Sequence, residues 1–237
     1  GGDEEDPARR RAAGEPRLDK SVTSELGGVG PAIIVPEETW SDDNVDAVAR
    51  DIATQRLHNS GFNCVATQIV VIPEAWGKAD AFVDRLRHHL AIAPTRPAYY
   101  PGASSRQLAV VTVHPQANVL GGDPNVPRTL VDHLDPEDAE EHLFTQEAFG
   151  PVLGVVRLPG TREPEPYLAA AVAFANERLA GTLSASIHLH PSTREALGAA
   201  FDDLVAQLRY GTIGINAWGG TVFGMPGGTW GAFPGHT

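Results

Sequence analysis

The 237-residue chain has very little sulfur, with one methionine and one cysteine, Cys64. A single cysteine excludes an internal disulfide and a cysteine-based zinc site. The lack of disulfides suits a reducing compartment, so we expect a cytoplasmic protein. No apolar run approaches the roughly 18 residues that span a bilayer, and no signal peptide is visible, so we expect no membrane partner.

Positive charge is also scarce. The chain has 18 Lys and Arg against 30 Asp and Glu, a net charge of −12, whereas nucleic-acid binding needs clustered Lys and Arg. The sequence contains no G-x-x-x-x-G-K-[ST] loop, no G-x-G-x-x-G and no G-x-S-x-G elbow. The nine histidines form no metal set, because His88 and His89 are neighbours rather than four apart on their helix. We therefore expect no nucleic-acid partner, no metal and no phosphate-binding loop.

The residues that are present alternate between strand-like and helix-like segments. At 42% hydrophobic and 20% charged, the composition is ordinary for a globular domain. Strands are predicted at 31–36, 67–73, 128–134, 151–159, 182–190 and 211–216. Helices are predicted at 41–60, 75–91, 165–180 and 192–210, the last with Ser192 and Glu195 as a capping box. This order predicts an α/β fold with a largely parallel sheet flanked by helices.

Three regions differ in character. Residues 1–24 predict a linker or a remnant of a preceding domain, 25–216 carry the α/β pattern, and 217–237 predict an ordered loop rich in Gly, Pro and aromatic residues. Within the α/β region, 92–127 is rich in Pro and Gly, and its run 108–113 is compatible with strand or helix. Both ends of the chain look cut from something longer, and we expect a fragment of a larger parent protein.

Cys64 ends the stretch "HNSGFNC", which leads from a predicted helix into a turn. A lone thiol on such a turn is either a small buried hydrophobe or a nucleophile, and free cysteine is commonly buried. The flanking residues weaken the buried reading without deciding the question, because Gly61 permits unusual backbone angles and Asn63 brings an amide that can hold an oxyanion or the loop.

Two further segments are candidates for chemistry. Glu25 in "ELGG" precedes a predicted buried strand, and its alternative reading is a solvated linker carboxylate. Glu147 and Phe149 in "EAFGPV" precede another strand, where the alternative is a turn with a packed Phe. Trp218, Phe223 and Trp230 in the C-terminal segment are candidates for a substrate pocket, although aromatic loop residues usually serve packing.

Taken in order, "ELGG" (25–28), the Gly-Phe-Asn-Cys turn (61–64), "EAFGPV" (147–152), "FANERLAGTLSASI" (174–187) and "YGTIGIN" (210–216) resemble the aldehyde dehydrogenase superfamily. The likeness extends over nearly the whole chain from about residue 20. It implies a catalytic-domain fold, a small aldehyde substrate, NAD or NADP as coenzyme, and a possible homo-oligomer in the full-length parent.

The resemblance also implies roles for individual residues. Cys64 would attack the aldehyde to give a thiohemiacetal and then a thioester, and its backbone N–H would form half of the oxyanion hole. Glu25 would activate the hydrolytic water. Glu147 would hydrogen-bond the ribose next to the nicotinamide, with Phe149 packing beside it. Transfer of the acyl group to CoA instead of water is an alternative, as is a catalytically silent domain.

The sequence departs from the family in several places. Phe62 stands where the family usually has Gln, and Val29 where Lys usually follows "ELGG". The family's C-terminal Lys and Ser are absent from "PGGTWGAFPG". The coenzyme-binding half and the Asn of the oxyanion hole usually precede "ELGG", so the resemblance predicts the catalytic half of a divergent enzyme.

Overall fold

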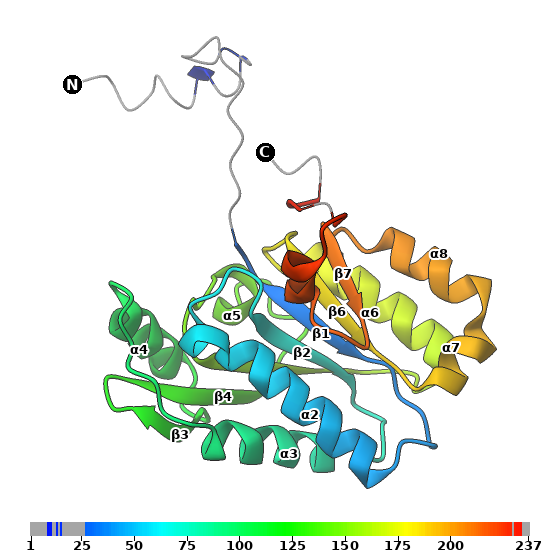
Figure 1. The fold of residues 1–237 in the computed structure, drawn as a ribbon, viewed down its shortest axis with the longest axis horizontal. Helices are drawn as coiled ribbons and strands as arrows, with labels where there is room; N and C mark the ends of the chain where they lie inside the picture. The colour runs from blue at the N-terminus through cyan, green and yellow to red at the C-terminus, as the bar shows by residue number, and fades with distance from the viewer. Residues whose placement is uncertain (1–8, 11–12, 14, 16–26, 229, 234–237) are drawn as a thin grey trace.

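A computed structural model describes residues 9, 10, 13, 15, 27–228 and 230–233 (Figure 1). Its centre is a seven-stranded sheet in the order β3-β4-β5-β2-β1-β6-β7. All neighbouring strands are parallel except the antiparallel edge pair β3 and β4. The strands are β1 (Gly30–Ile34), β2 (Thr67–Pro73), β3 (Asn118–Asp123), β4 (Val126–Leu134), β5 (Val152–Leu158), β6 (Ser184–His188) and β7 (Thr212–Ile215).

Helices cover both faces of this sheet, as Figure 1 shows. One face packs on α2 (Asp42–Leu57) and α3 (Ala79–Ile92), where the core includes Ile52, Phe82 and Leu86. The other face packs on α4 (Ala103–Val113), α5 (His142–Thr145), α6 (Pro164–Arg178), α7 (Pro191–Leu197) and α8 (Ala199–Gln207). Two 3₁₀ segments, η1 (His58–Gly61) and η2 (Gly219–Gly224), complete the described chain. Every residue of β1 and β2 is buried, which explains why these strands are almost continuously apolar.

These elements confirm the predicted α/β fold and most of its segments. The run 108–113 is helical, in α4, while β3 and the 3₁₀ segment η2 were not predicted. The single helix predicted over 192–210 is wrong, because Gly198 takes φ +53° and separates α7 from α8. The predicted capping box at Ser192 is also wrong, since α7 begins at Pro191 and His190 is its N-cap.

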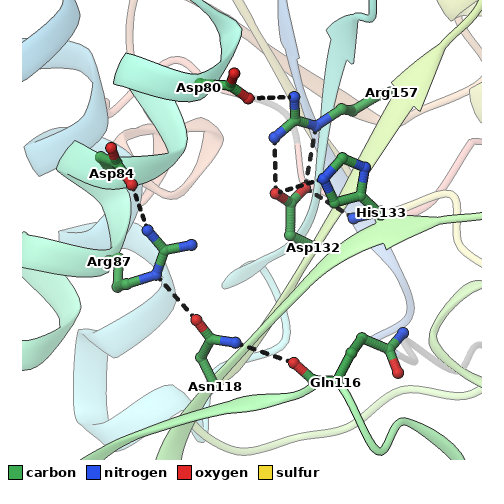
Figure 2. A network of polar contacts seen from close by, with 8 residues as sticks. All are labelled: Asp80, Asp84, Arg87, Gln116, Asn118, Asp132, His133 and Arg157. Atoms are coloured by element: carbon green, nitrogen blue, oxygen red, sulfur yellow. Dashed lines mark hydrogen bonds and ion pairs between the residues drawn. The ribbon is translucent and has the colours of Figure 1, made fainter.

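An ion-pair network fastens α3 to the carboxyl ends of two strands (Figure 2). Arg157 of β5 donates to Asp132 of β4 and to Asp80 of α3, at 2.7 Å each. Nearby, Arg87 pairs with Asp84 and also donates to the side chain of Asn118 in β3, 2.9 Å away. The network fixes the register of α3 on the sheet, at the end opposite to the turn that carries Cys64.

No helix in the described part of the chain is long and apolar enough to cross a membrane.

Candidate active site

The segments singled out from the sequence meet at the amino ends of three parallel strands. Gly27 and Gly28 precede β1, Cys64 precedes β2, and Glu147 precedes β5. Because β1, β2 and β5 are adjacent and parallel, these segments share one edge of the sheet. Open α/β sheets more often bind ligands at the carboxyl edge, so this arrangement is unusual.

The turn that carries Cys64 is built from left-handed backbone. Asn59, Ser60 and Gly61 take φ values of +53°, +58° and +82° in succession, and they reverse the chain after α2. The side chain of Asn63 holds the turn, since its Oδ1 accepts from the Val65 N–H at 2.9 Å and its Nδ2 lies 2.9 Å from Nδ1 of His58. The amide of Asn63 therefore supports the loop in this structure, while Cys64 itself is partly exposed.

The Cys64 turn packs directly on the loop that carries Glu147. A Cβ added at Gly61 would lie 2.4 Å from both the carbonyl carbon and the oxygen of Gly150, so only glycine fits there. Next in the chain, the ring of Phe62 lies against that of Phe149, with centroids 5.9 Å apart. Phe62 thus fills space between the two loops.

Gln68 and Arg106 clamp the Glu147 loop from both sides. The side chain of Gln68, in β2, accepts from the Ala148 N–H at 2.8 Å and donates to the carbonyls of Leu143 and Gln146 at the same distance. Arg106 of α4 donates to the carbonyl of Ala148 at 3.1 Å. These bonds fix the backbone on each side of Glu147.

Glu147 directs its carboxylate toward Gly27 and Gly28. A Cβ at Gly27 would lie 2.6 Å from Oε1 of Glu147, and the Gly28 N–H donates to the same carboxylate. Burial raises the pKa of Glu147, while Arg56, the Gly28 N–H and Arg106 act in the opposite direction. Glu147 is thus a partly buried carboxylate beside Gly27 and Gly28.

The three aromatic residues of the C-terminal segment lie in two places. The indole N–H of Trp218 donates to the carbonyl of Val65, the residue after Cys64, at 2.8 Å, and its ring lies 5.0 Å from that of His58. Phe223 and Trp230 pack on each other with centroids 4.1 Å apart, and Phe223 is 65% exposed. Trp218 is therefore tied to the Cys64 turn, whereas Phe223 and Trp230 form a pair of their own.

Glu25, the expected general base, lies outside the described residues. Within the described ranges, no group of three or more His, Cys, Asp or Glu side chains is arranged to hold a metal ion.

Several residues that shape the site were not singled out from the sequence. Arg56 and Gln68 are buried polar side chains, 2% and 0% exposed, in segments that read as an amphipathic helix and an apolar strand. The sequence did contain one indication for Gln68, because it is a polar residue inside the otherwise apolar run "TQIVVIP". Tyr99 and Tyr100, whose rings pack on Phe62, come from the stretch 92–127 that had no predictable structure.

The sheet and the helices that flank it share their fold with solved aldehyde dehydrogenases. Lactaldehyde dehydrogenase from Escherichia coli superposes with a TM-score of 0.66 at 24% identity, over 90% of this chain and 44% of that one. The NADP-dependent glyceraldehyde-3-phosphate dehydrogenase from Bacillus halodurans C-125, solved with NADP, gives 0.66 at 22% identity, over 90% and 42%.

A curated relative agrees with this class. Geranial dehydrogenase of Castellaniella defragrans is 26% identical over 226 residues, covering 85% of this chain and 41% of the relative. No protein-family model matches the chain. The comparisons confirm the predicted resemblance to the aldehyde dehydrogenase superfamily, and the chain spans about two fifths of the length of these relatives.

Proposed function

We propose that this chain is the catalytic domain of a divergent NAD(P)-dependent aldehyde dehydrogenase that oxidises an aldehyde to a carboxylic acid. The observation that carries the proposal is the packing of the Cys64 turn against the Glu147–Phe149 loop at the amino ends of β2 and β5. It brings the two sequence segments that most resemble the family's nucleophile and coenzyme contacts side by side, although they lie about 80 residues apart.

Cys64 supplies the nucleophile in this proposal. Its thiolate adds to the aldehyde carbon, and the carbonyl oxygen becomes an oxyanion that the Cys64 backbone N–H stabilises. Loss of hydride from that carbon leaves a thioester on Cys64, and water cleaves the thioester to release the acid and the thiol. The partial exposure of Cys64 supports this role over that of a buried hydrophobe.

Glu147 and Phe149 would hold the nicotinamide end of NAD or NADP. The bound coenzyme supplies the hydride acceptor. The Glu147 carboxylate would accept a hydrogen bond from a ribose hydroxyl, and Phe149 offers an aromatic face beside it. The residues present fit that end of the coenzyme, because Gln68 and Arg106 hold the backbone next to Glu147 and its carboxylate is only partly buried beside Phe149. Glu25 remains the proposed base for the hydrolytic water.

The test is the rate at which iodoacetamide alkylates the chain across pH. Cys64 is the only cysteine, so all thiol labelling reports on it, and a Cys64→Ser variant gives the background. The same chain unfolded in urea provides the reference thiol, with an ordinary pKa of about 8.5. We expect native Cys64 to react with an apparent pKa below that of the unfolded chain. A native thiol slower than the unfolded one at every pH would refute an activated nucleophile.

A second candidate is a catalytically silent domain that keeps the same fold. Turnover assays on a longer parent protein separate the two, since Cys64→Ser should abolish NAD(P)H production. A product assay with and without CoA distinguishes hydrolysis from acyl transfer to CoA. An activated thiol in a parent that gives no turnover would favour the silent domain.

A further inference from the structure

One arginine that the family resemblance does not assign reaches both ends of the Cys64 turn. Arg56 lies in the last turn of α2, and its side chain is 2% exposed. Its Nη2 donates to the carbonyl of Gly61 at 2.8 Å, on the entry side of the turn. Its Nη1 donates to the carbonyls of Thr67 at 3.1 Å and Ala66 at 3.4 Å, on the exit side. A single planar group therefore spans the segment that presents Cys64.

This arginine keeps its charge in spite of its burial. Burial lowers the pKa of Arg56 to about 10, while Glu147 acts to raise it, so the guanidinium is protonated at neutral pH. Its Nε has no hydrogen-bond partner among the described residues. A buried cation is costly unless its donors are satisfied, and here both Nη atoms of Arg56 donate to carbonyls of the turn.

We propose that Arg56 is a positioning residue, which fixes the Cys64 turn from both ends. The meaning of this role for catalysis rests on the proposed function, whereas the positioning itself does not.

Arg128 offers a matched control elsewhere in the molecule. It is also a buried arginine, 5% exposed, and its Nη1 donates to two backbone carbonyls, those of Leu90 at 2.9 Å and Ala91 at 3.1 Å. Those carbonyls belong to the end of α3 rather than to the Cys64 turn. A purely structural role for Arg56 predicts similar consequences for Arg56→Met and Arg128→Met.

The first measurement is amide hydrogen exchange in the complete 237-residue chain and its variants. The N–H groups of Val65 and Ala66 bond to Asn63 within the turn, so their exchange reports local opening. For Arg56→Met we expect these two amides to exchange at least about tenfold faster relative to the amides of β2, whereas Arg128→Met leaves that ratio within about twofold. Equal ratios in the two variants overturn the proposal.

The second measurement separates charge from geometry with Arg56→Lys. Lysine keeps the positive charge but lacks the planar fork that reaches both ends of the turn. Fast exchange of the turn amides should persist in both Arg56→Lys and Arg56→Met, and wild-type protection in Arg56→Lys overturns the two-ended anchor.

The design remains decisive if Arg56→Met does not fold, because Arg56→Lys alone tests the anchor by exchange. Iodoacetamide labelling of the wild-type chain tests the proposed function independently. A sluggish thiol together with Arg56-dependent exchange would refute the nucleophile and leave the positioning role intact. An activated thiol together with exchange that does not depend on Arg56 would support the nucleophile and refute the positioning role.

Discussion

Replacing Gly61 with alanine tests the contact on which the candidate site is built. Gly61 takes φ +82°, and its missing Cβ would lie 2.4 Å from the Gly150 carbonyl, a backbone group that cannot swing away. Gly121 is the control, since it takes φ +85° and a Cβ there would meet nothing within 4 Å. Comparing the two alanine variants separates the free-energy cost of left-handed backbone, which both share, from the cost of the clash with Gly150, which only Gly61→Ala has.

The expected losses in the free energy of unfolding combine these two costs with a smaller gain from the unfolded chain. Left-handed backbone costs alanine about 1–2 kcal/mol, and the reduced freedom of the unfolded chain returns about 0.4–1 kcal/mol in both variants. Overpacking adds about 1–3 kcal/mol at Gly61 only, with the upper end expected because backbone must move. We therefore expect Gly61→Ala to lower the free energy of unfolding by about 2–4 kcal/mol and Gly121→Ala by about 1 kcal/mol.

Urea unfolding followed by circular dichroism measures both values, provided the slopes against urea match the wild type. The rate of Cys64 alkylation, measured in parallel, should change in Gly61→Ala and stay at the wild-type value in Gly121→Ala. If the two variants lose the same stability within about 0.5 kcal/mol, which is the usual scatter of such comparisons, the Cys64 turn is not pinned to Gly150.

Three further predictions concern groups away from the Cys64 turn. Both ring nitrogens of His114 face acceptors, Val110 O at 2.8 Å and Glu141 Oε1 at 2.9 Å, and the bond to Glu141 raises the pKa of His114. The free energy of unfolding that wild type gains over His114→Gln should therefore be largest below the unfolded pKa of about 6.5 and should shrink as pH rises through the raised pKa of the folded state. Urea melts at pH 6 and pH 9 will check this. Burial lowers the pKa of His188 to about 4, so the free energy of unfolding should fall by up to about 3 kcal/mol as pH drops from 6.5 to 4. In melts over the same range, His188→Gln should show a smaller loss of stability with acid. Arg157→Met strands the mostly buried Asp132 and should lower the melting temperature by several degrees, whereas removing the exposed Asp84 should change it by less than about 1 °C.

The sequence by itself determined the class of fold. Apolar runs such as 67–73 and 151–159 fixed the buried strands, because a strand covered on both faces must be apolar throughout. Helical spacing fixed α2 and α6 to within a few residues. The motifs around Cys64 and Glu147 suggested a candidate chemistry, since a lone thiol on a Gly-rich turn stands out in a chain with one cysteine.

Tertiary structure decided how those motifs meet. Gln68 bonds to the carbonyl of Leu143, 75 residues away, and Gly61 fits only because Gly150 approaches it, and neither contact leaves a local signal in the sequence. Local patterns also missed the break at Gly198, where one backbone angle divides a continuous helical pattern. Arg56 belongs to a segment that was predicted only as a helix, and the turn that folds back over the end of α2 is what buries it. The periodicity of apolar residues indicates which face of a helix or strand is buried. It does not indicate which residues pack on that face, because those residues are brought there by turns and contacts between segments that are far apart in the sequence.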